Sequence, residues 1–169
     1  MMLALLLSLA TLDGRVIDPF AGDTRGTVFV FIHPDCPVSN RYAPELNRLH
    51  DEYAARGVRL FAVYPGREDD EAEIRAHYKE YGLRATALRD PEFRLADLAR
   101  VTMTPEAAVF VGQQLVYRGR IDDRAPRLGV WRPHPASRDL ADVLARVAKG
   151  ETPSFRTTQA VGCYIKPLG

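Results

Sequence analysis

Hydrophobic and polar positions alternate along this chain in blocks that favour strands and helices in turn. Residues 27–32 and 58–64 are nearly continuous apolar runs, which is typical of strands covered on both faces. Between them, residues 39–56 carry apolar side chains at helical spacing, and Gly57 follows as a helix terminator. The apolar stripe of this helix comprises Tyr42, Leu46, Leu49 and Tyr53. The pattern predicts a buried strand, an amphipathic helix and a second buried strand, of which the first is central.

The same alternation continues in the middle of the chain. The pattern predicts a helix over residues 68–81 and a short strand over residues 86–88. The inward side chains of this helix are expected to be Ile74, Tyr78 and Tyr81. Asp90 is then expected to cap a further helix, with Pro91 at its first position, that runs to about residue 100.

A hairpin and a last helix are predicted nearer the C-terminus. Residues 107–111 and 115–120 are expected to form the two strands of the hairpin. Ser137 is the expected cap of the last helix, which Gly150 ends. Its inward residues are expected to be Leu140, Val143, Leu144 and Val147. Residues 151–169 follow without a clear periodicity.

The N-terminal residues leave two interpretations open. Residues 1–10 are almost wholly apolar and end in a small-x-small pattern, as in a truncated export signal, but they lack Lys and Arg. The alternative is an N-terminal strand or helix packed on the domain. Residues 12–16 contain Asp-Gly, which predicts a tight hairpin. Export is slightly favoured, and it would place the protein in an oxidising space.

This order of elements predicts an α/β fold with a mixed central β-sheet and helices on both faces. The expected organisation is one domain over residues 12–149, preceded by an N-terminal segment (1–11) and followed by a tail (150–169). The length of 169 residues suits one globular domain.

Charge and cysteine content narrow the function. Lys and Arg (23) nearly balance Asp and Glu (22), so no global field favours nucleic acid or anionic membrane. No further segment is long enough to span a bilayer. The two cysteines, Cys36 and Cys163, lack the spacing of a zinc finger, and no metal or other cofactor is expected.

Cys36 carries the strongest chemical signal. It follows the first apolar strand directly, at a predicted strand-to-helix junction, where unpaired backbone N–H groups and the helix dipole favour a thiolate. The alternative is a buried free cysteine that acts as a small apolar residue. Turn and cap residues around it, including Asp35 and Pro37, favour the nucleophile.

Three features resemble the thioredoxin-like superfamily, specifically its redoxin branch of the AhpC/TSA type, over residues 12–149. The segment from Cys36 to Ser39 occupies the C-x-x-C position, Pro44 matches a helix-kinking proline, and Thr104-Pro105 matches a cis-proline loop. The resemblance implies a thioredoxin-like fold in which Thr104, Pro105 and Pro37 contact the substrate. An extended peptide could pair with the Thr104 backbone as an added strand.

Pro44 has two interpretations. It either bends the helix, which sets the first turn at an angle, or simply begins the regular helix after a loop.

The departures from the family pattern matter as much as the matches. Ser39 replaces the second motif cysteine, so Cys36 lacks its usual local disulfide partner. Ser39 is expected either to donate a hydrogen bond to the thiolate or to cap the helix. The peroxiredoxin pattern is also incomplete, because His33 stands where Thr or Ser is expected and Phe29 where a proline is expected.

Cys163 is a candidate substitute for the missing partner. It lies in a small apolar island, residues 161–165, and the neighbouring Gly162 would let the backbone approach another surface closely. The hypothesis is that this island docks near Cys36 and that Cys163 resolves a sulfenate or mixed disulfide. The alternative is a tail cysteine that only packs.

Other residues near the motif have smaller predicted roles. His33 is a candidate proton shuttle, thiolate partner or metal ligand, or else a loop residue that hydrogen-bonds locally. Asp35 is expected to cap backbone N–H groups. Arg41 and Arg120 are candidate cationic neighbours of the thiolate, although arginines are usually at the surface.

Three functions follow from these residues. The first is a thiol-disulfide oxidoreductase that acts on protein or small-molecule thiols and disulfides and uses an external thiol reductant. The second is a thiol peroxidase that passes through a sulfenic acid. The third is a copper-binding module, which the loss of cysteine at Ser39 disfavours. The natural substrate and the oligomeric state do not follow from the sequence.

Overall fold

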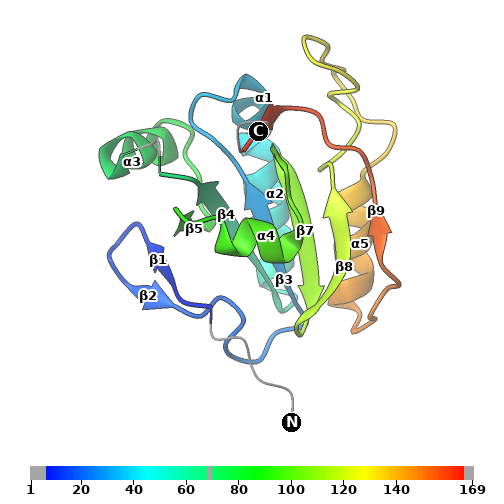
Figure 1. Cartoon of the computed structure of the whole chain (residues 1–169). Coiled ribbons are helices and arrows are strands. Elements are labelled where there is room, and N and C mark those ends of the chain that lie inside the picture. Colours follow the sequence, from blue (N-terminus) through cyan, green and yellow to red (C-terminus); the bar gives the residue numbers. More distant parts are fainter. Residues whose placement is uncertain (1–6, 68–69, 166–169) are drawn as a thin grey trace.

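The computed structural model describes residues 7–67 and 70–165 of the chain (Figure 1). The helices are α1 (Pro37–Arg41), α2 (Ala43–Ala54), α3 (Glu71–Glu80), α4 (Arg94–Ala99) and α5 (Asp139–Ala148). The strands are β1 (Leu9–Thr11), β2 (Val16–Ile17), β3 (Gly26–Phe31), β4 (Val58–Pro65), β5 (Thr86–Asp90), β6 (Met103–Thr104), β7 (Glu106–Val111), β8 (Gln114–Gly119), β9 (Arg156–Thr157) and β10 (Cys163–Tyr164).

The main sheet is mixed, with strand order β2-β1-β5-β4-β3-β7-β8-β9. β3 lies inside it, parallel to β4 and antiparallel to β7, so that Phe29 pairs with Phe61 on one side and Ala108 on the other. Every residue of β3 is buried. This confirms the prediction that the continuous apolar run forms a central strand.

Helices cover both faces of the sheet, as predicted. α2 and α5 pack on one face, where the helical stripes of both helices join one apolar cluster. α4 packs on the other face through Leu95, Ala96 and Ala99, against Phe29 and Phe31. Figure 1 shows α4 in front of the sheet and α2 and α5 behind it.

The two predicted hairpins are confirmed. β1 pairs antiparallel with β2 around Gly14, which has φ 84°, and β7 pairs antiparallel with β8. Leu7 and Leu9 are buried and Leu9–Thr11 belongs to the main sheet, whereas residues 1–6 lie outside the described residues. The apolar N-terminal stretch therefore packs on the domain from Leu7 onward.

The helix predicted over residues 39–56 differs from the prediction. Its backbone turns at Tyr42, which separates α1 from α2, and Pro44 lies in the first turn of α2. A proline there loses no intrahelical hydrogen bond, because the first N–H groups of a helix are unpaired. Pro44 thus starts a helix, and the segment before it is a helical turn rather than a loop.

Two predicted helix starts are wrong. Asp90 is the last residue of β5, and α4 begins only at Arg94 after Phe93 adopts a left-handed conformation with φ 57°. The Asp90 carboxylate reaches α4 from the strand end and accepts the Ala96 N–H at 2.8 Å. Arg138 precedes α5 in place of Ser137, whose N–H donates to the Asp123 carboxylate.

The tail contains two strands that its sequence pattern does not predict. β9 lies parallel to β8 at the edge of the main sheet, and β10 pairs antiparallel with β6 in a separate small sheet. Within the described residues, no helix is long and apolar enough to cross a membrane.

Candidate active site

Cys36 occupies the junction between the central strand and α1, as the sequence predicts. It is the N-cap residue of α1, and 1% of its surface is exposed. Its S–H donates to the Thr104 carbonyl oxygen at 3.2 Å, across 68 residues of sequence. The fold therefore brings Cys36 against the Thr104-Pro105 loop.

The Thr104-Pro105 peptide bond is cis, as the resemblance implies. Glu106 holds this loop, because its buried carboxylate accepts the N–H groups of Thr102 at 2.9 Å and Met103 at 3.2 Å. Burial raises the pKa of Glu106. No sequence motif identifies this role of Glu106, since it lies at the start of an apolar strand and only the folded loop brings the three residues together.

The C-terminal strand docks on the same loop. Cys163 is the register partner of Thr104, and the Thr104 hydroxyl donates to the Cys163 carbonyl oxygen at 3.5 Å. The Ile165 N–H donates to the Thr102 carbonyl oxygen at 3.1 Å and extends the pairing. Both cysteines of the protein thus lie beside Thr104, and both are free thiols.

The pKa values of the two thiols are shifted in opposite directions. Burial raises the pKa of Cys36, but the Ser39 hydroxyl, the Ser39 backbone N–H, the Cys163 thiol and Thr104 outweigh burial, and the pKa is lowered overall. Burial and the neighbouring Cys36 raise the pKa of Cys163 to about 11. Cys36 is therefore the more acidic thiol of the pair, and Cys163 is the less acidic one.

Ser39 is buried inside α1, with 3% of its surface exposed, and it does not cap the helix. With Cys36 as a neutral thiol, the Ser39 hydroxyl has no hydrogen-bond partner of good geometry, although it lies near enough to lower the pKa of Cys36. A buried hydroxyl without a partner is costly, and a thiolate would give it an acceptor. Of the two predicted roles, the surroundings favour hydrogen bonding to the thiolate.

The other residues predicted near Cys36 make contacts of their own. The His33 carbonyl accepts the Cys36 N–H at 3.1 Å, and its ring nitrogen Nδ1 accepts the Asp35 N–H at 3.1 Å. The expectation that Asp35 caps backbone N–H groups is wrong at the start of α1, which has no side-chain cap. Arg120 forms an ion pair with Asp139 at 2.7 Å.

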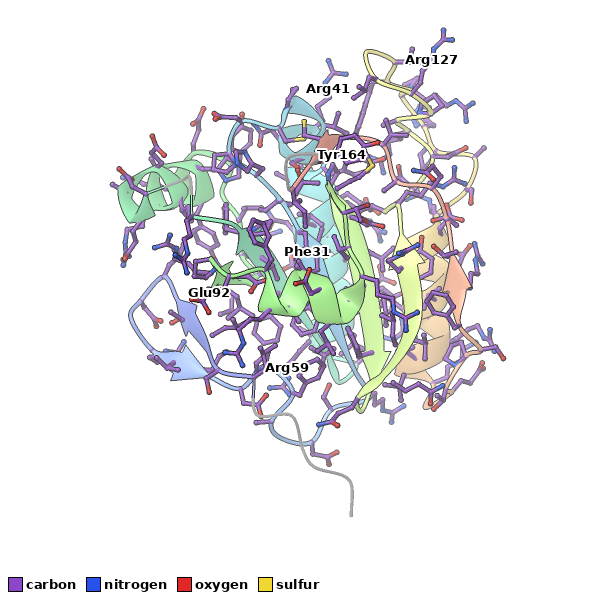
Figure 2. The ribbon with its side chains drawn as sticks, in the orientation of Figure 1. Phe31, Arg41, Arg59, Glu92, Arg127 and Tyr164 are labelled. Carbon is purple, nitrogen blue, oxygen red and sulfur yellow. The ribbon has the colours of Figure 1, made fainter. Side chains whose placement is uncertain are left out.

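A small pocket of about 140 Å³ lies beside α1 and is lined in part by Pro37 and Arg41. The Arg41 guanidinium lies 5.4 Å from the ring centre of Trp131, a third lining residue. Figure 2 shows Arg41 and Arg127 projecting from the same end of the molecule as Tyr164 of β10. Pro37 is exposed at this end, while Cys36 directly before it is buried.

A hydrogen-bonded chain of side chains that the sequence does not predict holds the loop before Cys36. The Tyr64 hydroxyl contacts His77 Nδ1 at 2.8 Å, His77 Nε2 contacts the Asn40 side-chain oxygen at 2.7 Å, and the Asn40 amide donates to the Pro34 carbonyl at 2.9 Å. Burial lowers the pKa of His77, which favours the neutral ring. The three side chains come from α1, α3 and β4, so no local sequence pattern links them.

The described residues contain no group of three or more His, Cys, Asp or Glu side chains that could hold a metal ion. What the site does bring together is suited to thiol chemistry: a cysteine of lowered pKa at a helix start, a cis-proline loop and a second cysteine beside them.

This combination of a mixed sheet, a thiol at the first helix and a facing cis-proline loop defines a thioredoxin-like redoxin domain. The model of the AhpC/TSA family matches residues 7–119, and the chain belongs to that family. Membership indicates thiol oxidoreductase or peroxidase chemistry. Comparison with curated proteins finds no match.

Solved structures show the same fold over most of the chain. An uncharacterized conserved protein from Geobacillus kaustophilus is 26% identical, with a TM-score of 0.77 over 96% of this chain and 90% of its own. A hypothetical protein from Sinorhizobium meliloti is 25% identical, with a TM-score of 0.74 over 96% and 92%. A secreted Mycobacterium tuberculosis disulfide oxidoreductase is 18% identical, with a TM-score of 0.59 over 85% and 96%, and shares the fold.

Proposed function

We propose that this protein is a thiol-disulfide oxidoreductase in which Cys36 is the nucleophile and Cys163 of the same chain resolves the intermediate. The observation that carries the proposal is the pairing of β10 with β6, which sets Cys163 opposite Thr104 while the Cys36 thiol donates to the Thr104 carbonyl oxygen. Cys163 thereby supplies the resolving thiol that Ser39 cannot supply in the C-x-x-S motif.

The reaction proceeds in two exchanges when the oxidant is a disulfide. The Cys36 thiolate attacks one sulfur, forms a mixed disulfide and releases the other sulfur as a thiolate. Cys163 gives up its proton and attacks the Cys36 sulfur, which forms the Cys36–Cys163 disulfide and releases the second substrate thiol. An external thiol then reduces this disulfide and returns both cysteines to the starting state.

A peroxide is the second candidate oxidant, and membership of the AhpC/TSA family supports it. The Cys36 thiolate would attack one peroxide oxygen, become a sulfenic acid and release water or an alcohol after protonation. Cys163 would then displace water from the sulfenic acid and form the same disulfide. Both routes reach the same Cys36–Cys163 disulfide, which an external thiol then reduces.

Mass spectrometry of the whole protein tests the proposal. After treatment with cystine or hydrogen peroxide, we expect one intrachain disulfide between Cys36 and Cys163, with the loss of two hydrogen atoms. Cys163→Ser should stop at a Cys36 adduct with cystine or a Cys36 sulfenate with peroxide, and Cys36→Ser should leave Cys163 unmodified. An unreactive Cys36, or Cys163 remaining reduced while Cys36 carries a persistent adduct, would refute it. Consumption of peroxide with a thiol donor, measured against reduction of cystine, separates the two oxidants.

A further inference from the structure

Strand β10 occupies the backbone edge on which an extended peptide would dock. Peptides that bind as an added strand pair with free N–H and C=O groups of an edge. In this chain the pairing runs through Thr102, Met103 and Thr104, and β10 already uses it. Among the described residues, β6 pairs with no strand other than β10.

The fit of β10 on this edge is specific to its sequence. A Cβ atom at Gly162 would overlap the Thr104 carbonyl oxygen and lie 3.1 Å from the Pro105 side chain, so any larger residue would force the strand away. Ile165 packs against the apolar cluster under α4, whereas Tyr164 is 60% exposed. The face of the chain at β10 that carries Ile165 is thus packed against the protein, and the face that carries Tyr164 is exposed.

The docked strand also leaves little room at the nucleophile. Cys36 is 1% exposed, so the active sulfur cannot meet a disulfide on the surface of a folded protein without a local opening. This burial favours a small oxidant over a folded protein.

The part of the tail that precedes β10 is held by contacts of its own. The Thr158 hydroxyl contacts the Tyr117 hydroxyl at 2.6 Å and accepts the Arg120 N–H at 3.1 Å. Arg156 forms an ion pair with Asp139 at 2.7 Å. These contacts hold β9 on the main sheet, so β10 can leave the site while the rest of the tail stays in place.

We infer that β10 acts as an internal substrate strand and restricts the Cys36 site to small-molecule oxidants, namely hydroperoxides and low-molecular-weight disulfides, while it excludes extended peptides. This inference rests on the proposed function of Cys36. In it, the Cys36 thiolate attacks a small disulfide that diffuses to the covered sulfur, whereas a peptide must first displace β10 from Thr104.

The test uses the full chain with Cys163→Ser, so that each reaction stops at the first exchange. Two probes carry the same aryl disulfide, one as a small molecule and one attached to the cysteine of a peptide of about ten residues. In both, Cys36 forms a mixed disulfide and releases the aryl thiolate, whose absorbance gives the second-order rate constant. Gly162→Val is added to displace β10, and Thr152→Ala, an exposed change in the same tail, is the matched control.

We expect the parent to prefer the small probe by about tenfold or more, which corresponds to about 1.4 kcal/mol, because the peptide must first displace β10. Gly162→Val should remove most of this preference by accelerating the peptide, and Thr152→Ala should preserve it. Ile165→Asp, which releases β10 from its other end, repeats the test if Gly162→Val fails to fold.

Equal rates for both probes in the parent, or an unchanged preference in folded Gly162→Val and Ile165→Asp, would overturn the inference alone. A Cys36 that reacts with neither probe in any variant would instead overturn the proposed function.

Discussion

Replacing Ser39 by alanine tests the electrostatics of the site, because the change should destabilise the thiolate form of the protein but not the thiol form. The perturbation is made in the Cys163→Ser background, so that Cys36 is the only thiol and the side chain at position 163 still offers a hydroxyl donor. In the thiolate form, the lost Ser39 hydrogen bond is one to a charged group, worth about 1.5–3 kcal/mol. Since one pKa unit corresponds to about 1.4 kcal/mol, the pKa of Cys36 should rise by about one to two units.

The protonated protein should respond differently. While Cys36 is a neutral thiol, the buried Ser39 hydroxyl has no partner of good geometry, and such a group costs about 1–3 kcal/mol. Removing it should leave the free energy of unfolding at pH 5 unchanged or raised by about 1 kcal/mol, after allowance for the small void that remains.

The dependence of stability on pH follows from the same pKa shift. The folded pKa of Cys36 is lowered below its unfolded value of about 8.5. Its contribution to stability is therefore fully present above about pH 8.5 and is lost as the pH falls through the folded pKa. Ser39→Ala should flatten this dependence.

The rate of Cys36 alkylation by iodoacetamide as a function of pH gives the pKa, and urea unfolding at pH 5 and pH 9 gives the stability. Ser154→Ala, an exposed serine in the tail, is the control and should change neither quantity. Two outcomes would refute the reasoning. A pKa change below about 0.3 unit would show that the Ser39 hydroxyl does not stabilise the thiolate, and a loss of more than about 1 kcal/mol at pH 5 would show that it stabilises the neutral thiol form.

Three further predictions concern stability measured by urea unfolding. The pKa of His77 is lowered chiefly by burial, so its contribution to the free energy of unfolding is full above about pH 6.5 and declines as the pH falls. His77→Gln should therefore lessen the decline of stability between about pH 6.5 and 5, and an unchanged slope would contradict this. Asp139→Ala breaks ion pairs to the partly exposed Arg120 and Arg156 and should cost about 1–2 kcal/mol, so a neutral result would show that these pairs do not hold β9. Phe29→Ala removes a fully buried ring in contact with three other phenylalanines and should cost about 3–5 kcal/mol, whereas a loss below about 1 kcal/mol would mean that the core refills the space.

The strands and helices were predictable where burial produces a regular pattern. The apolar runs at residues 27–32 and 58–64 match β3 and β4 to within one residue, because a strand covered on both faces has few polar positions. The start of α4 was not predictable in this way. Asp90 and Pro91 have the composition of a helix start, but the Asp90 carboxylate caps α4 from the end of β5 after a left-handed Phe93.

The site was predictable to the extent that its residues are close in sequence or belong to a family motif. Cys36 and the Thr104-Pro105 loop follow from such motifs, and the structure brings them to 3.2 Å. Glu106 and His77 do not follow from a motif. The Glu106 carboxylate accepts backbone N–H groups, which carry no side-chain signature, and His77 contacts Asn40, which is 37 residues away in sequence.

The sequence by itself determined the α/β class, the central strand and the position of Cys36 at a strand-to-helix junction, because burial and backbone preference act over a few neighbouring residues. Only the tertiary structure decided the surroundings of that cysteine. The tail has no periodicity to reveal β10, whose pairing depends on the Thr104 backbone and on the space that Gly162 leaves. The register of Cys163 against Thr104 therefore exists only once segments 59 residues apart have folded together, and it determines which group faces the Cys36 thiol.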